Sequence, residues 1–253
     1  MRTVLITGAS SGIGAACAEV LASETTYRLL LCARRMDRLD ALKAKIQANY
    51  PDCEIYCFEL DVRNQEAIEQ TWKNLPEAWR KIDVLINNAG LSQGLEPIQD
   101  GHIGDWDRMI DTNIKGLLYV TKHTLPLMEQ SVAPHIINLG SIAGKEVYPN
   151  GNVYCATKHA VDALTQAMRI DLLEKGIKVT SIDPGMVETE FSEVRFKGDK
   201  ERAKDVYQGL QPLIGRDIAE IIAFVLSRPA HVNINDLLVM PTAQANGTKV
   251  VRK

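Results

Sequence analysis

The sequence predicts an α/β fold in which helices cover both faces of one doubly wound parallel sheet. Short apolar segments rich in Val, Ile and Leu alternate along the chain with longer segments of helical periodicity. This alternation is typical of βαβ units, which place their strands parallel. The chain has 253 residues, of which 45% are hydrophobic, so it is long enough to fill one large core. We therefore expect a single domain over residues 1–253.

The first half of the chain supplies three clear strand and helix pairs. Strand 3–7 is the apolar run Thr-Val-Leu-Ile-Thr, and helix 13–23 begins in the glycine-rich turn that follows it. Strand 28–33 contains three consecutive leucines and precedes helix 37–49. Strand 54–59 mixes Ile with Tyr and Phe, and it precedes helix 64–74. These runs have the composition of buried strands and the spacing of helices that pack on them.

The second half continues the alternation and then departs from it. Strands are expected at 84–87, 135–139 and 178–183, with helices at 106–130 and 153–175 between them. A late helix at 217–227 precedes a last strand at 236–240, and a tail over 242–253 follows. Residues 188–211 lack a clear period, and the length of this segment predicts a mobile lid over a site.

Composition narrows the classes of partner. The net charge of −3 and the absence of a long basic run argue against nucleic acid or an anionic membrane surface. The amino-terminal apolar stretch is too short for a secretory signal, and no apolar run approaches the ~20 residues of a membrane span. A cytoplasmic protein with a small-molecule partner is expected. The five cysteines predict buried, reduced thiols. Cys53 and Cys57 lack a nearby histidine, so no metal site is expected.

A glycine-rich turn links the first strand to the first helix, the setting in which helix N-termini bind phosphate. Glycines permit close approach of the backbone to a ligand, and hydroxyls beside them strengthen the phosphate interpretation. A tight turn without a ligand is the alternative. The pattern predicts a Rossmann-type nucleotide site, and its expected cofactor residues are Gly8, Ser10, Ser11, Gly12, Ile13 and Gly14.

Two arginines follow the second strand, where enzymes that use NAD carry an acidic residue for the ribose 2′-hydroxyl. Arg34 and Arg35 suit a 2′-phosphate, and the sequence places no carboxylate there to repel it. NADP is therefore the expected cofactor. Arg34 is favoured because it comes first after the strand. The alternative is that both arginines decorate the surface of the next helix.

Tyr154 and Lys158 lie four residues apart in an expected helix, so they share one helix face. A neighbouring positive charge favours the phenolate, and we expect it to lower the tyrosine pKa and make a general acid/base. An exposed helical pair is the alternative. Yet Ser141 precedes the pair, and Asn87-Asn-Ala-Gly90, Asn113 and Pro184-Gly185 stand at boundaries of the expected elements. With these motifs, residues 3–241 resemble the short-chain dehydrogenase/reductase family.

The resemblance implies roles for named residues. Tyr154 would exchange a proton with the substrate oxygen, Ser141 would hydrogen bond the same oxygen, and Lys158 would also bind the nicotinamide ribose. Asn113 would support a water path to the lysine. The alternatives are a capping role for Ser141 and a backbone contact for Asn113. Further cofactor contacts implied by the resemblance are Asp61, Val62, Asn88, Ala89, Gly90, Pro184, Gly185, Val187 and Thr189. Asp61 could instead cap the following helix, and the asparagines could fix a turn.

The substrate is inferred from the lid, because lids touch substrate. Segments 190–199, 229–235 and 240–241 resemble NADP-dependent 3-hydroxy acid dehydrogenases, which act on L-serine, L-allo-threonine, 3-hydroxypropionate or malonic semialdehyde. Arg195 is then the candidate clamp for the substrate carboxylate, with an exposed loop arginine as the alternative. His231 and Asn233 are expected to be structural or to lie at a subunit interface.

Other readings of the same scaffold stay open. A reductase of 3-oxoacyl thioesters, sugars or sulfoacetaldehyde would carry the same catalytic set, because a shared fold does not fix the substrate. An NADP-sensing protein without catalysis is a further alternative, although a sensor does not need a proton donor. The resemblance also implies a homotetramer.

Overall fold

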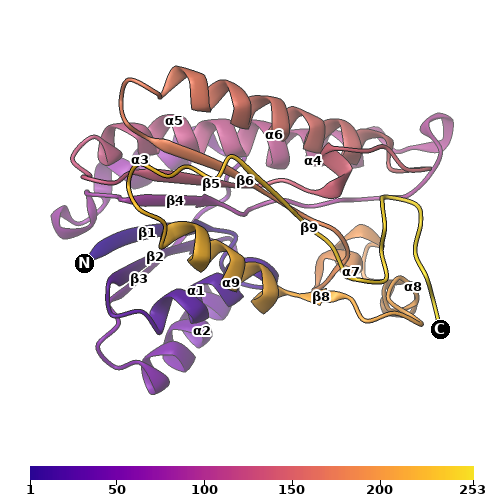
Figure 1. Ribbon diagram of the computed structural model, residues 1–253, viewed down its shortest axis with the longest axis horizontal. Coiled ribbons are helices and arrows are strands. Elements are labelled where there is room, and N and C mark those ends of the chain that lie inside the picture. The colour runs from indigo at the N-terminus through magenta and orange to yellow at the C-terminus, as the bar shows by residue number, and fades with distance from the viewer.

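The computed structural model describes all 253 residues, and its centre is a seven-stranded parallel sheet (Figure 1). Across the sheet, the strands are β3 (Ile55–Glu59), β2 (Tyr27–Ala33), β1 (Arg2–Thr7), β4 (Val84–Asn87), β5 (His135–Leu139), β6 (Lys178–Pro184) and β9 (Asp236–Val239). The order reverses between β1 and β4, which is where doubly wound sheets open a crevice for ligands. The predicted fold class is confirmed.

Helices cover both faces of the sheet (Figure 1). One face carries α1 (Gly12–Ala22), α2 (Met36–Asn49) and α9 (Gly215–Leu226). The other carries α3 (Gln65–Asn74), α5 (Leu117–Met128) and α6 (Asn152–Asp171), with α4 (Ile103–Ile110) against α6. Short 3₁₀ turns are η1 (Glu77–Trp79), η2 (Ile98–Asp100) and η4 (Ile142–Gly144). None of these helices is both long and apolar enough to cross a bilayer.

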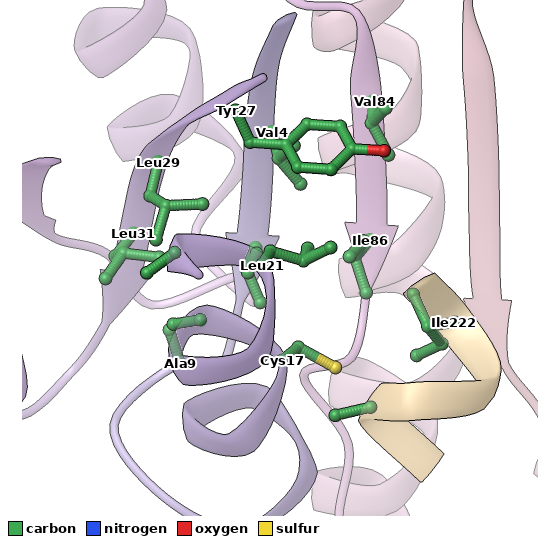
Figure 2. Packing of buried hydrophobic residues seen from close by; sticks show 14 of the residues in the cluster. Val4, Ala9, Cys17, Leu21, Tyr27, Leu29, Leu31, Val84, Ile86 and Ile222 are labelled. Atoms are coloured by element: carbon green, nitrogen blue, oxygen red, sulfur yellow. The ribbon is translucent and has the colours of Figure 1, made fainter. Parts of the chain in front are cut away.

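The alternation of side chains along each strand divides the core in two. Val4 and Ile6 of β1 pack toward α1, whereas Leu5 between them packs toward the opposite layer, as the two-residue period of a strand requires. Figure 2 shows Val4 and Ile86 near Leu21 of α1. All five of these side chains have no solvent exposure. The buried strands therefore fix the position of the turns at their carboxyl ends.

Two expected helices differ from those observed. The helix expected over 106–130 is α4, the π-helical segment η3 (Asp111–Gly116) and α5 in succession. Asn113 lies in this wide turn, where its amide binds the backbone of Leu91, and such π-bulges are frequent at functional sites. The helix expected over 153–175 ends at Asp171, and the chain turns at Gly176, whose φ is +66°.

The expected lid contains regular structure that its sequence did not reveal. It holds α7 (Phe191–Arg195) and α8 (Lys200–Asp205), and a two-stranded sheet of β7 (Val187–Glu188) and β8 (Leu213–Ile214) borders it. These elements are too short to show a period. The tail reaches the lid, where the Lys253 N–H donates to the Gly209 carbonyl at 2.8 Å. The mobility of the lid stays a prediction.

Candidate active site

A cavity of about 480 Å³ opens at the carboxyl ends of the strands, between the glycine turn, α6 and the lid. Of the residues predicted to bind cofactor or substrate or to act in catalysis, all line this cavity except Gly14 and Asn113. The structure thus brings together residues that are spread over most of the sequence. The two exceptions lie directly behind the cavity wall.

The glycine turn has a shape that side chains would block. Gly8 and Gly12 have φ of +66° and +55°, a region that L-residues with a side chain rarely adopt. A Cβ on Gly8 would lie 2.9 Å from the Ala89 Cα, and one on Gly14 would lie 2.6 Å from the Gly8 carbonyl oxygen. Asn88 holds the turn by donating to the carbonyl of Gly8 at 3.2 Å. Gly14 therefore serves the packing of the turn.

The first turn of α1 is open to an anion. Its N-cap residue, Ser11, makes no side-chain capping hydrogen bond, so the free N–H groups and the positive end of the helix dipole remain available. Arg35 donates to the hydroxyls of Ser10 at 3.3 Å and Ser11 at 3.0 Å. This combination of helix N-terminus, hydroxyls and guanidinium fits the phosphates of a dinucleotide, including one on the ribose 2′ position.

The expectation that no carboxylate lies near the two arginines is wrong. Glu190, at the start of the lid, pairs with Arg35 at 3.1 Å and also contacts Arg38. The sequence separation of 155 residues hides this contact. Arg34 lines the same cavity, but its side chain makes no hydrogen bond. The observed contacts thus favour Arg35 as the residue that binds the 2′-phosphate, whereas the order of the two residues along the chain favours Arg34.

Asp61 and Val62, which the motif assigns to the adenosine part of a cofactor, line the cavity. Asp61 does not cap the next helix, because Asn64 caps it by accepting from the Ala67 N–H. Instead, the Nε of Arg63 donates a hydrogen bond to the Asp61 carboxylate at 2.9 Å. This contact holds the pKa of the carboxyl below its usual value. Arg63 also lines the cavity. It was not among the predicted residues, since a single arginine in a loop has no distinctive pattern.

Tyr154 and Lys158 share one face of α6 and are both buried. The Lys158 Nζ lies 6.0 Å from the centroid of the Tyr154 ring, and it donates to the Leu139 carbonyl at 2.7 Å. Burial lowers the pKa of Lys158 to about 8, against the opposing charge of Asp183. The exposed-pair alternative is therefore excluded.

The expected direction of the Tyr154 pKa is wrong for this structure. Burial raises the pKa of the phenol, and the nearby Tyr148 raises it further. The charge of Arg195 and a hydrogen bond from Ser141 act in the opposite direction. Desolvation disfavours the phenolate, and the Lys158 ammonium is directed to a backbone carbonyl instead of the phenol. Burial of the ring thus favours the protonated phenol.

Ser141 and Asn113 also have the structural roles that their sequence context allowed. Ser141 accepts the Ala143 N–H at 3.1 Å and so caps η4. Asn113 donates to the Leu91 carbonyl at 2.8 Å and to Thr157 at 3.0 Å. The Asn113 amide thereby joins the π-helical segment η3 to α6 at Thr157, the residue before Lys158. These contacts fix both side chains.

The lid places Arg195 beside Tyr154. Its guanidinium carbon lies 5.3 Å from the centroid of the Tyr154 ring, and its nitrogens donate to Ser92 at 3.1 Å and Tyr148 at 3.0 Å. No carboxylate of the chain pairs with it. Ser92 and Tyr148 were not predicted, because their role depends on a contact with the lid.

The carboxyl-terminal tail contributes to the site in a way that its sequence did not indicate. Gln244 is buried and lines the cavity, and its Oε1 accepts the N–H of Met186 at 2.8 Å, next to Gly185. Arg252 donates to the backbone carbonyl of Val206 at 3.0 Å, so it ties the tail to the lid. Asn233 bonds the backbone of Val179 and is structural.

Comparison with known proteins gives one consistent result. A family model described as short chain dehydrogenase matches residues 2–200. The NADP-dependent 3-hydroxy acid dehydrogenase YdfG of Salmonella typhi is 46% identical over 243 residues, which are 96% of each chain. Sulfoacetaldehyde reductase 2 of Chromohalobacter salexigens is 44% identical and covers 96% of this chain and 95% of that protein. A solved closed form of serine dehydrogenase, complexed with NADP+, has a TM-score of 0.92 at 42% identity and covers 100% of both chains.

Proposed function

The chain belongs to the short-chain dehydrogenase family, and on that premise we propose that it oxidises the β-hydroxyl of small 3-hydroxy acids or reduces the matching semialdehydes. It is an oxidoreductase. The proposal is carried by one observation: an arginine without a carboxylate partner, Arg195, lies beside Tyr154 in the cavity. The names of relatives that are 42–46% identical support it.

NADP is the cofactor in this proposal. The residues proposed to hold its phosphates are those of the glycine turn with Arg34 and Arg35, and Asp61 and Val62 are proposed to bind the adenosine; all of them line the cavity except Gly14. The backbone of Pro184, Gly185 and Val187 and the hydroxyl of Thr189 would hold the carboxamide end. When bound, the nicotinamide accepts the hydride from the alcohol or returns it to the carbonyl.

The chain's own residues handle the proton. In the reductive direction the Tyr154 hydroxyl donates its proton to the substrate oxygen, and in the oxidative direction it takes the proton back. Ser141 donates a hydrogen bond to the same oxygen, where negative charge develops. The Lys158 ammonium lies close enough to favour the phenolate after the proton has left. Asn113 fixes the helix turn that faces Lys158.

Arg195 would bind the acid group of the substrate. Its position over the Tyr154 ring sets the acid one short carbon chain away from the reacting oxygen, which suits a 3-hydroxy acid. Its bonds to Ser92 and Tyr148 fix the direction of the guanidinium, so less side-chain entropy is lost on binding. A sulfonate would fit the same guanidinium. Sulfoacetaldehyde is therefore the second candidate, and a relative described as its reductase supports it.

A homotetramer is also proposed from the family resemblance, and a cytoplasmic location stays a prediction. Support for assembly comes from exposed apolar side chains on the long helices, namely Ile103, Ile110, Leu118 and Ile170, because such side chains commonly mark interfaces. Light scattering coupled to size-exclusion chromatography measures the mass directly.

The substrate experiment follows nicotinamide absorbance with matched pairs of compounds. The oxidative panel contains L-serine, L-allo-threonine, 3-hydroxypropionate and a 3-hydroxyacyl thioester, and the reductive panel contains malonic semialdehyde, sulfoacetaldehyde and propanal. We expect the highest kcat/KM for the carboxylates. Faster turnover of sulfoacetaldehyde or the thioester would assign the rival substrate, and binding of NADPH without turnover of any compound would favour the sensor.

A further inference from the structure

Behind Ser141 lies a carboxylate that the proposed reaction does not use. Asp183, near the end of β6, has no solvent exposure. Its Oδ1 accepts the main-chain N–H of Ser141 at 3.1 Å and the hydroxyl of Ser181 at 2.9 Å. A Cβ on Gly140 would lie 1.8 Å from this oxygen, so the glycine before Ser141 leaves the space that the carboxylate fills. The contact is therefore built into the packing of this loop.

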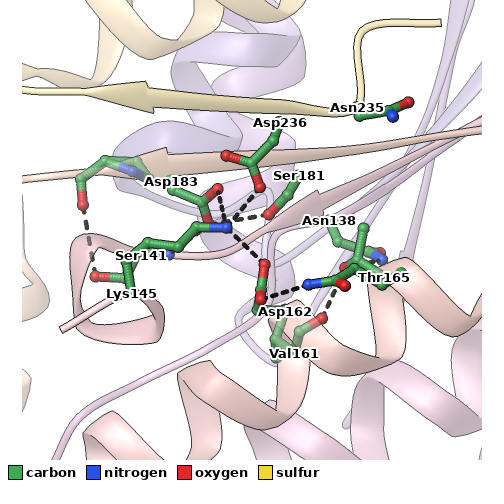
Figure 3. A network of polar contacts seen from close by, with 12 residues as sticks. Asn138, Ser141, Lys145, Val161, Asp162, Thr165, Ser181, Asp183, Asn235 and Asp236 are labelled. Carbon is green, nitrogen blue, oxygen red and sulfur yellow. Dashed lines mark hydrogen bonds and ion pairs between the residues drawn. The ribbon is translucent and has the colours of Figure 1, made fainter. Parts of the chain in front are cut away.

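The second oxygen of Asp183 has no hydrogen-bond partner, but it lies near the ammonium of Lys145. Figure 3 shows the Lys145 ammonium surrounded by carboxylates from β6, α6 and β9. The Nζ lies 2.6 Å from Asp162, 2.5 Å from Asp236 and 3.5 Å from the Asp183 Oδ2. Lys145 ends the turn that Ser141 begins, and the Gly144 N–H donates to the Ser141 carbonyl at 2.8 Å. Asp183 thus binds the first residue of this short turn and lies beside the charge of its last residue.

The use of a carboxylate here needs a reason, because burial of charge is costly. A neutral acceptor could satisfy the Ser141 N–H, but a charge-assisted bond is about twice as strong as a neutral one. The charge of Asp183 also opposes the loss of the Lys158 proton. One buried group therefore acts on two members of the site, through a hydrogen bond to one and through its field on the other.

We propose that Asp183 is a positioning residue that fixes Ser141 and thereby aims the Ser141 hydroxyl at the substrate oxygen. The inference rests on the role proposed for Ser141. Ser141 has extended backbone, with φ of −176°, and its N–H is the only one of the loop that the carboxylate binds. Without that bond, rotation of the Ser141 backbone would move the hydroxyl away from Tyr154, and errors of about 1 Å in such a group can cost ~100-fold in rate.

The test is a graded series at position 183 with a control at the other end of the sheet. Asp183→Asn keeps the shape and weakens the acceptor, and Asp183→Ala removes it. Asp83 is the matched control, because it is buried and accepts the Thr3 N–H at 2.8 Å and the Ser131 hydroxyl at 2.6 Å. Readouts are kcat and KM on whichever compound the wild-type protein turns over best, the Kd of NADPH, and hydrogen exchange at the Ser141 amide.

We expect kcat to fall about threefold to tenfold in Asp183→Asn and up to ~100-fold in Asp183→Ala, as misplacement of a catalytic group allows. KM and the NADPH Kd should stay within about threefold, since Asp183 does not line the cavity and reaches Lys158 only through its field. Exchange at the Ser141 amide should rise in the same order. Asp83→Asn should lower thermal stability and leave kcat unchanged.

Several outcomes would overturn the inference. One is a folded Asp183→Ala protein with wild-type kcat, and another is a fall in kcat without faster exchange at Ser141. If the alanine variant does not fold, an asparagine variant that equals wild type in both readouts has the same meaning. If the proposed substrate class is wrong, the series can still be interpreted, because the ratio of variant to wild-type kcat can be measured on any compound that the protein turns over. If nothing is turned over, the proposed function fails while the exchange readout still tests the bond.

Discussion

The glycine turn and the lid face each other across the same cavity, but they are held by different forces. The turn follows β1, whose Val4, Leu5 and Ile6 have no solvent exposure, so apolar packing on both faces of the sheet fixes it. The lid is held by polar contacts such as Lys197 to Asp105 at 2.8 Å and Glu190 to Arg35 at 3.1 Å.

This difference bears on how the site works. Packed cores resist displacement, whereas partly exposed ion pairs contribute little free energy each and can be exchanged for a ligand group. The cofactor half is therefore preformed, and the lid is the part whose contacts a ligand can replace. Substitutions on each side of the cavity test this contrast, and the strongest test is Tyr154 of α6, which lines the cavity between the two regions.

The largest effect is expected at Tyr154, which stands on the rigid α6 and faces the lid. Tyr154→Phe should lower kcat by about a hundredfold to ten-thousandfold, because it removes the proton donor. The NADPH Kd should change only a few fold. Lys158→Ala should damage both parameters, since the ammonium is proposed to bind the ribose. Turnover by the phenylalanine variant above a tenth of wild type would exclude the acid/base role.

Arg195 tests whether the lid recognises charge. Arg195→Ala should weaken kcat/KM on L-serine or 3-hydroxypropionate by about 2–4 kcal/mol, the range expected when a buried charge loses its partner. The loss on propanal should be much smaller. Arg202→Ala is the control, because Arg202 lies in the same lid and stacks on Phe196 at 4.3 Å outside the cavity. Equal losses on charged and neutral substrates would indicate lid folding instead of recognition.

Arg35 tests the rigid side of the cavity. Arg35→Ala should weaken NADP binding by about 1.5–3 kcal/mol, the contribution of a hydrogen bond to a charged group, and leave NAD binding unchanged. Arg34→Ala should have a smaller effect, because Arg35 alone contacts Ser10 and Ser11. Calorimetric titration with both cofactors measures these constants. A larger loss in Arg34→Ala would restore the order that the sequence favoured.

The smallest effect is expected where the two regions meet. Glu190→Gln removes a carboxylate from Arg35 and Arg38, and the 40% exposure of its side chain limits the pair to about 0–1 kcal/mol. NADPH should bind up to about fivefold more tightly, since Arg35 is no longer shared. Hydrogen exchange in the lid should rise without cofactor, with the melting temperature unchanged. Weaker binding of NADPH by the variant would mean that Glu190 supports the cofactor. The control is Glu193→Gln, which removes another carboxylate of the lid.

The scaffold and most of the cavity wall could be predicted from the amino-acid sequence alone. Its strands are continuous apolar runs, and its glycine turn and the pair Tyr154 and Lys158 are local patterns with a local physical cause. Gly8 needs a positive φ, and four residues span about one helical turn. Such features depend on neighbours in the chain, so they are legible without a structure.

The contacts between distant segments, and the pKa shifts caused by burial, became visible in the folded structure alone. Glu190 meets Arg35, and Asp183 meets Ser141, across 155 and 42 residues of chain. The direction of the Tyr154 pKa was mistaken for the same reason, because it depends on the burial of the ring, which lies in a cluster with Ala143 of η4 and Phe191 of the lid. Sequence spacing records which side chains share an element, whereas dielectric environment and ion pairing depend on which elements the fold brings together.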